Sequence, residues 1–190
     1  AADSLFGFYL RKKDYAMAEK YLRYFSDYDP VKKVKMGQLY MKQGKTEDAY
    51  EKLEDVVFST YTTLNLTFGT MITQALEERN HEYAKFLAKK MNVLANAFDM
   101  GKYHECAAML NVVVAEKDVE GTFQVAKQLL ENVDTMGDFR ESKLYQHMEF
   151  RNTENPYAKE MKKALLEGFR TEEEFSYMNG YEPWDQFIHE

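Results

Sequence analysis

The chain has 190 residues, of which 45% are hydrophobic, and it carries a formal net charge of −7 at pH 7. This length is sufficient for one domain with a hydrophobic core, and the negative charge argues against the chain gripping nucleic acid by itself, because duplex binding depends on neutralising phosphates with Lys and Arg. The single cysteine, Cys106, excludes an internal disulfide framework and indicates a reducing, cytoplasmic setting.

Helical periodicity recurs along the first 135 residues. Apolar residues step by three or four, which places them on one face of a helix, and no run shows the period-two alternation of a half-buried strand. The pattern predicts an all-α fold with eight helices in this region, at about 3–12, 14–27, 30–42, 46–58, 60–78, 81–99, 102–116 and 118–135. Shorter helices follow. Because the connections are short, consecutive helices are expected to be antiparallel neighbours.

Turn and cap residues mark several of the helix boundaries. Asp29 before Pro30 predicts a helix start, since Asp caps helices and Pro is tolerated at their first position. Gly44 and Gly101 predict breaks between helices. Thr171, followed by glutamates, predicts a capping box that opens a late helix.

Three segments of the chain align with one another. They are DYAMAEKYL at 14–22, KTEDAYEKL at 45–53 and NHEYAKFLA at 80–88. The alignment places Ala18, Ala49 and Ala84 at one position, where a small residue lets the two helices of a hairpin cross closely. These segments resemble the tetratricopeptide repeat, a helix-turn-helix unit. The resemblance implies a right-handed superhelix of antiparallel hairpins over residues 1–135, with a C-terminal helical cap over 136–190 in the same globular unit.

A second resemblance covers nearly the whole chain. It is carried by QLYMKQGKTEDAYEKLEDVVFSTY, LANAFDMGKYHECAAMLNVVVAEKDVEGT, SKLYQHMEF and FRTEEEFSYMNG. These stretches resemble the C-terminal region of helix-turn-helix transcription regulators of the Cro/repressor-like (XRE) type from Gram-positive bacteria. The resemblance implies a cytoplasmic regulator, with a possible homodimer. It would contact DNA only through an upstream DNA-binding domain that this sequence does not contain.

Residues that could carry chemistry are present but scattered. His104 and Cys106 are two apart and therefore point to different sides of a helix. The histidines at 81, 147 and 189 have no partners at metal-ligand spacing. The acidic pairs lie along helix surfaces or helix starts, and no glycine loop could cradle a phosphate. We therefore expect no catalytic residue, no metal site and no cofactor.

The stretch from Val56 to Leu76 contains no charged residue but six threonines. Its many hydroxyl and amide side chains argue against a membrane span, which should be predominantly apolar. As one helix, it would bury a stripe comprising Leu64, Phe68, Met71 and Ala75. Its threonines would then either bond to carbonyls one turn back inside a packed helix or face an open groove.

A solenoid of hairpins presents a concave face, which the first helix of each hairpin usually lines. The predicted ligand-binding residues on that face are Gln38, Thr62, Asn65, Thr73 and Asn111. Their hydroxyl and amide groups could hydrogen-bond the backbone of a peptide or protein partner. The predicted function is therefore ligand sensing or protein interaction, relayed to an upstream DNA-binding domain. The alternative is a passive dimerisation or docking scaffold, which would need an apolar patch formed by Met41, Phe58, Tyr61, Tyr181 and Trp184.

Overall fold

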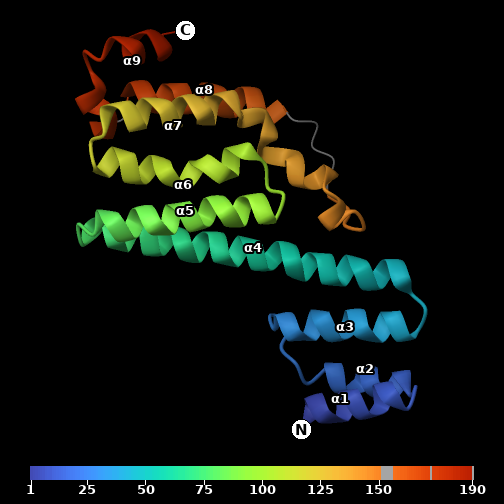
Figure 1. Ribbon diagram of the computed structural model, residues 1–190. Helices are drawn as coiled ribbons and strands as arrows, with labels where there is room; N and C mark the ends of the chain where they lie inside the picture. Colours follow the sequence, from blue (N-terminus) through green and yellow to red (C-terminus); the bar gives the residue numbers. More distant parts are fainter. Residues whose placement is uncertain (151–155, 172, 190) are drawn as a thin grey trace. The chain divides into compact units, whose positions relative to one another are not determined.

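The computed structural model describes residues 1–150, 156–171 and 173–189, and every regular element within these ranges is helical (Figure 1). The all-α prediction is confirmed. The chain divides into two compact units, residues 1–60 with 143–150 and residues 61–142 with 151–190. These units separate between residues 60 and 61, and residues 143–150 belong with the first. The predicted boundary between repeats and cap at residue 135 stays a prediction.

The first unit contains three helices and the start of a fourth. These are α1 (Ala2–Arg11), α2 (Tyr15–Leu22), α3 (Pro30–Lys42) and the first half of α4 (Thr46–Glu77). Asp29 caps α3 as predicted, accepting from the Val31 N–H at 2.9 Å. At Gly37, α3 and α4 approach so closely that a Cβ would lie 2.9 Å from Leu53 Cγ. Ala49 is fully buried on α4, so a small residue occupies the predicted crossing.

α4 is one continuous helix of 32 residues. The prediction of separate helices at 46–58 and 60–78 is wrong, because no glycine or proline interrupts the chain between them. The Ser59 hydroxyl donates back to the Val56 carbonyl at 3.2 Å, a bond that an unbroken helix accommodates. None of the described helices, α4 included, is both long enough and apolar enough to cross a membrane.

The buried face of α4 differs by one position from the predicted stripe. Met71 is 36% exposed, whereas Ile72 is 1% exposed and lies in the core beside Ala75. The spacing from Phe68 through Ile72 to Ala75 is four and then three, which matches the helical repeat. Met71 therefore faces outward, one residue away from the helix side that packs.

The second unit begins in α4 and runs to the end of the described chain. Its further elements are α5 (His81–Ala97), α6 (Lys102–Ala115), α7 (Val119–Glu131), η1 (Val133–Glu141), α8 (Pro156–Thr171), η3 (Glu173–Met178) and α9 (Glu182–Phe187). Successive helices α5, α6 and α7 lie side by side (Figure 1). A core cluster joins α7 to the C-terminal helices through Ala126, Leu130, Phe169, Phe175, Met178, Trp184 and Ile188.

One turn geometry recurs between the paired helices. Within the described residues, the backbone φ is positive at Lys13, Gly44, Arg79, Asp99 and Lys117. The next N–H then donates to the carbonyl five residues earlier, as in Asp14 to Tyr9, Lys45 to Tyr40, Asn80 to Ala75, Met100 to Ala95 and Asp118 to Val113. This bond closes a helix in the left-handed ending. The side chains of Asp14, Asn80 and Asp118 then cap the following helix, so each reversal needs only a few residues.

The predicted capping box at Thr171 is wrong. Thr171 is the last residue of α8, and its hydroxyl donates to the Glu167 carbonyl at 2.8 Å. The helix continues this far because Phe169, 4% exposed, belongs to the core shared with α7. The next element is the 3-10 helix η3, which begins at Glu173.

Residues 143–150, including η2 (Lys143–Tyr145), pack on the first half of α4 and are called the strap below. His147 is its anchor. The His147 N–H donates to Glu54 Oε2 at 2.8 Å, and His147 Nδ1 lies 2.5 Å from Glu54 Oε1. The imidazole also stacks on Tyr50, and Tyr145 meets the ring of Phe58 edge-on. A buried carboxylate on α4 thus fixes a segment 93 residues further along the chain.

Candidate functional site

Three of the five predicted binding residues line one hollow in the second unit. Asn65 and Thr73 come from α4 and Asn111 comes from α6, around a space of about 440 Å³. Thr62 is exposed on α4 but is not part of the lining, and Gln38 is exposed on α3 of the first unit. We call this space the α4–α6 hollow. Its full lining is Asn65, Leu66, Gly69, Thr70, Ile72, Thr73, Met91, His104, Ala107, Ala108 and Asn111.

Helix geometry explains which side chains reach the α4–α6 hollow. On α6 the lining residues stand at positions 104, 107, 108 and 111, the spacing of one helix face. On α4 they run from Asn65 to Thr73, beside the buried Ile72. Met91 of α5 also lines the hollow. The hollow is therefore lined by one face of α4 and one face of α6.

The lining of the α4–α6 hollow combines polar and apolar side chains and contains no Asp, Glu, Lys or Arg. The hydroxyl of Thr70 donates to the Leu66 carbonyl at 2.9 Å, and that of Thr73 donates to the Gly69 carbonyl at 3.2 Å. Both hydroxyl hydrogens are therefore bonded to carbonyls one turn back, which is one of the two arrangements expected for the threonines of this helix. Each hydroxyl oxygen still has lone pairs that can accept a hydrogen bond.

The lining also includes two amide side chains, Asn65 on α4 and Asn111 on α6. Among the described residues, Asn65 and Asn111 have no hydrogen-bond partner for their side chains. Each amide offers two N–H donors and a carbonyl acceptor. The hollow therefore presents unused donors and acceptors from both helices, with the exposed Leu66 and the buried Ile72 between them.

Gly69 leaves the centre of the α4 wall open. A Cβ built at this glycine meets no atom within 4 Å, in contrast to the crowded Gly37. A glycine inside a helix costs about 1 kcal/mol relative to alanine, and no neighbour in the described chain requires its small size. Its absence of a side chain exposes α4 backbone to whatever occupies the hollow.

His104 also lines the hollow, although the sequence did not single it out for binding. Its Nε2 lies 3.3 Å from the Met136 carbonyl, which requires a proton on Nε2 and leaves Nδ1 as an acceptor. Burial lowers the pKa of His104, and the Met136 carbonyl opposes this in part. The imidazole is therefore neutral near pH 7. The signal that could have identified it is its spacing of seven from Asn111 on the same helix.

The burial of His104 predicts a pH-dependent stability. Because its pKa is lower in the folded chain than in the unfolded chain, the unfolded state binds the proton more tightly, and the free energy of unfolding falls as the pH drops below about 6.5. The contribution is restored as the pH rises toward 7. His104→Gln should flatten this slope in urea denaturation series. An unchanged slope in His104→Gln would contradict this.

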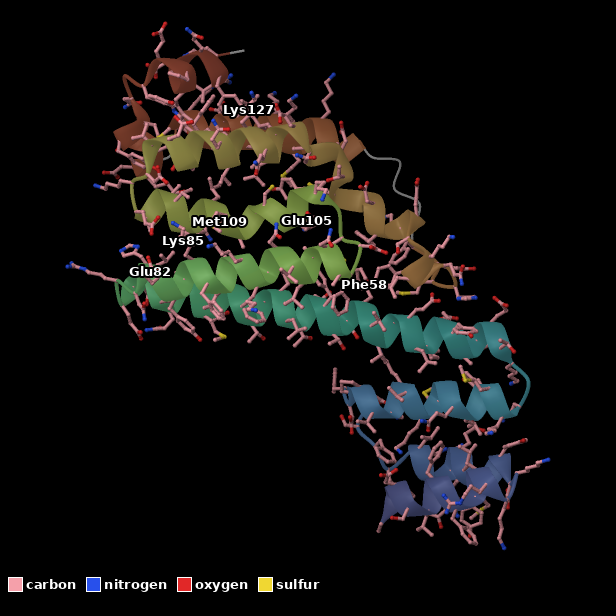
Figure 2. The ribbon with its side chains drawn as sticks, viewed as in Figure 1. Phe58, Glu82, Lys85, Glu105, Met109 and Lys127 are labelled. Atoms are coloured by element: carbon pink, nitrogen blue, oxygen red, sulfur yellow. The ribbon has the colours of Figure 1, made fainter. Side chains whose placement is uncertain are left out.

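A second hollow lies between α5 and α7. It measures about 370 Å³ and is lined by Ala88, Lys89, Asn92, Val93, Glu105, Cys106, Met109, Val125 and Gln128. Figure 2 shows Glu105 and Met109 on α6. His104 and Asn111 of the same helix line the α4–α6 hollow instead. Cys106 donates to backbone carbonyls within α6, and burial raises the pKa of its thiol. His104 and Cys106 line different hollows and do not form a nucleophile–base pair.

Comparison of the chain with protein-family models, with curated proteins and with solved structures finds no match. The described residues also contain no group of three or more His, Cys, Asp or Glu side chains placed to hold a metal ion. The amide and hydroxyl side chains of the α4–α6 hollow offer hydrogen bonds, and Leu66, Ile72 and Met91 offer apolar contact.

Proposed function

We propose that this chain is a ligand-sensing domain that binds a peptide or a peptide segment of a protein partner in the α4–α6 hollow. The observation that carries the proposal is an uncharged hollow with unused amide groups on facing helices, Asn65 on α4 and Asn111 on α6. A charged ligand would leave its charge unpaired there. A peptide backbone, in contrast, offers alternating donors and acceptors that the two amides can pair.

The other lining groups support a peptide ligand. The hydroxyl oxygens of Thr70 and Thr73 accept hydrogen bonds from N–H groups, while Leu66 and Met91 give apolar surface for side chains. Leu66 is 68% exposed, so this apolar surface is available without rearrangement. The volume of about 440 Å³ falls within the range of small-ligand sites, roughly 300–1,000 Å³.

The arrangement of the second unit supports a tetratricopeptide-like architecture. Alternate helices line opposite hollows, α4 with α6 and α5 with α7, as expected for hairpins stacked in two layers. The recurring left-handed turn and the buried Ala18, Ala49 and Ala84 fit a repeated hairpin. The unbroken α4 departs from a regular repeat. In the proposal the hairpins form a right-handed superhelix with the last helices as its cap.

The resemblance to XRE-type regulators supports the place of this domain in a cytoplasmic transcription regulator. Occupancy of the α4–α6 hollow would change the relative tilt of α4 and α6, because a ligand bonded to both helices fixes their separation. In a homodimer such a change would alter the spacing of two DNA-binding heads attached upstream. That spacing must match half-sites about one duplex turn apart.

Filling the hollow should abolish binding without unfolding the chain. In Gly69→Leu the new side chain enters open space and replaces a helix-weakening glycine, so thermal stability should be kept or raised while affinity falls more than about tenfold. The probe is a peptide selected from a random library on the wild-type chain, and affinity is measured by calorimetry. The matched control is Gly7→Leu, at a helical glycine of α1 whose nearest neighbour is the Arg11 guanidinium at 3.4 Å.

The two variants together show whether the selected peptide binds in the α4–α6 hollow or elsewhere on the surface. If Gly69→Leu and Gly7→Leu both bind the selected peptide as the wild type does, the hollow is not the binding site. Equal loss in both variants would likewise point away from it. The proposal requires loss in Gly69→Leu alone.

The scaffold alternative is supported by a different surface from the one predicted. Tyr61 and Trp184 are buried, at 5% and 1% exposure, so the predicted apolar patch does not form. Instead Tyr83, Phe86 and Val93 are exposed on one face of α5, and the Lys90 ammonium lies over the Phe86 ring. Light scattering of the isolated chain distinguishes the two functions. A concentration-independent monomer would remove the support for passive dimerisation through α5.

A further inference from the structure

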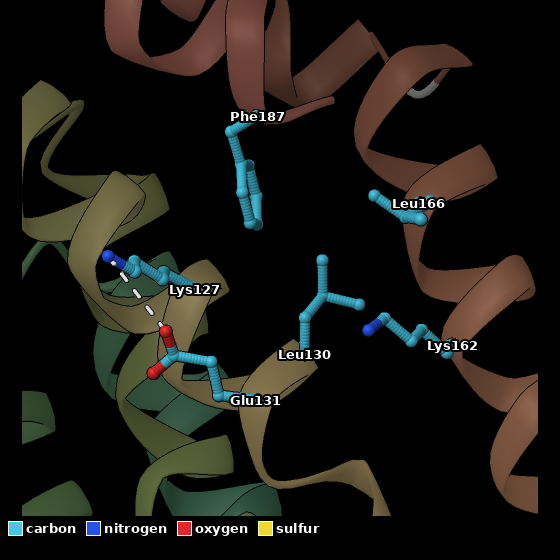
Figure 3. Close-up of a pocket in the computed structure, with 6 residues that line it drawn as sticks. All are labelled: Lys127, Leu130, Glu131, Lys162, Leu166 and Phe187. Atoms are coloured by element: carbon cyan, nitrogen blue, oxygen red, sulfur yellow. Dashed lines mark ion pairs between the residues drawn. The ribbon is translucent and has the colours of Figure 1, made fainter. Parts of the chain in front are cut away.

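A third cavity lies away from both hollows, between α7, α8 and α9. It has a volume of about 300 Å³ and is lined by Lys127, Leu130, Glu131, Lys162, Leu166 and Phe187. Figure 3 shows the Phe187 ring between the side chains of α7 and those of α8, with Leu130 facing it from below. Leu130, Leu166 and Phe187 form the apolar walls, and the charged residues stand at the rim.

The apolar walls are preformed. Leu130 is a buried member of the core cluster, and Leu166 and Phe187 pack against that cluster. The Phe187 ring meets the Phe123 ring edge-on, with centroids 5.7 Å apart, and lies 5.8 Å from Trp184. These contacts hold the aromatic wall in place, so an apolar ligand need not order it on binding.

The rim of this cavity carries one unbalanced positive charge. On α7 the Lys127 ammonium nitrogen lies 3.9 Å from Glu131 Oε1, and these two opposite charges offset each other. In the described chain Lys162 has no acidic partner, and it stands on the opposite side of the cavity on α8. Lys159 lies one turn earlier on the same helix face. A locally positive rim on a chain with a net charge of −7 favours an anion at this position.

We propose that this cavity binds a small amphipathic carboxylate. Its apolar body lies between Leu130, Leu166 and Phe187, and its carboxylate pairs with the Lys162 ammonium. An uncharged apolar molecule would use the walls alone, and a cation would meet Lys162 as a like charge. This site is separate from the α4–α6 hollow, and its ligand differs from the uncharged peptide proposed there.

The test uses three eight-carbon probes that differ only in their head group: octanoate, octan-1-ol and octylamine. Trp184 is the chain's single tryptophan and contacts Phe187, so its fluorescence reports occupancy. The wild type should bind octanoate more tightly than octan-1-ol, and octylamine most weakly. Lys162→Gln should weaken the affinity for octanoate by about three- to fivefold, which corresponds to the loss of a partly exposed ion pair. The affinity for octan-1-ol should stay unchanged.

The adjacent Lys163 gives the matched control. It is exposed on the same helix but does not line the cavity, so Lys163→Gln should bind octanoate as the wild type does. The proposal is overturned if no probe gives a saturable change, if octanoate and octan-1-ol bind equally, or if both lysine variants weaken octanoate to the same extent. Circular dichroism of each variant verifies that the helices are retained.

Discussion

Gly101→Ala should destabilise the second unit by about 3–5 kcal/mol. Gly101 precedes α6 with φ 95° and ψ 157°, a backbone region that is essentially restricted to glycine and costs other residues on the order of 1–3 kcal/mol. An added Cβ would also fall far inside van der Waals contact with the Thr135 carbonyl oxygen. Relieving that overlap costs about 1–3 kcal/mol more. The free energy of unfolding in urea is the measurement.

The reason for this sensitivity lies in how α6 begins. The Thr135 hydroxyl oxygen accepts from the Tyr103 N–H at 2.9 Å and donates to the Asn132 carbonyl at 2.8 Å. η1 therefore caps α6, and Gly101 allows it to approach. Gly44→Ala is the control, since Gly44 also has a positive φ but has open space around it, and should cost only about 1 kcal/mol. Equal costs at the two glycines would contradict the proposed contact with Thr135.

Glu54→Ala should destabilise the first unit by about 2–5 kcal/mol. Glu54 is 8% exposed, and its two oxygens hold the backbone N–H and the ring of His147. Removing it leaves both groups of His147 without their partner, which costs about 1–3 kcal/mol for each such buried group. Hydrogen exchange should locate the effect, with the amide of His147 and its neighbours in the strap losing protection first.

Glu51→Ala provides the comparison for Glu54. Glu51 pairs with Lys52 at 2.8 Å on α4, and both side chains remain partly exposed. Pairs that water still reaches contribute at most about 1 kcal/mol. The strap should keep its protection in that variant. Loss of strap protection in Glu51→Ala, or its retention in Glu54→Ala, would show that the His147 pair does not anchor the segment.

The sequence predicted helices well where the signal was local. Asp29 before Pro30 gave the start of α3, and the periodic stripe gave α5 almost to its ends. The left-handed turns at Lys13, Arg79 and Lys117 were not predicted. Glycine is the residue whose presence suggests a positive φ, and these three positions hold long charged residues. The strap was missed for a different reason. Its contact joins Glu54 to His147, and nothing local to either residue indicates the other.

The candidate site was predicted in part. Polar residues on the uncharged helix face pointed to Asn65 and Thr73, and the order of helices added Asn111 from α6. Gln38 belongs to the first unit, and the order of helices cannot say which hairpins share a hollow. His104 matches no metal-ligand or nucleophile–base spacing, so the sequence alone does not mark it as a binding residue. The openness at Gly69 could not be predicted, since it depends on what neighbouring helices leave empty.

The most direct test of the proposed binding site is a titration of the ¹⁵N-labelled chain with the library-selected peptide, following the side-chain amide signals of the asparagines. Binding in the α4–α6 hollow predicts that the signals of Asn65 and Asn111 shift and saturate together. The signal of Asn92, whose amide donates to the Glu105 carbonyl beside the α5–α7 hollow, should stay in place. A peptide that shifts Asn92 while Asn65 and Asn111 remain unchanged would contradict the proposed site.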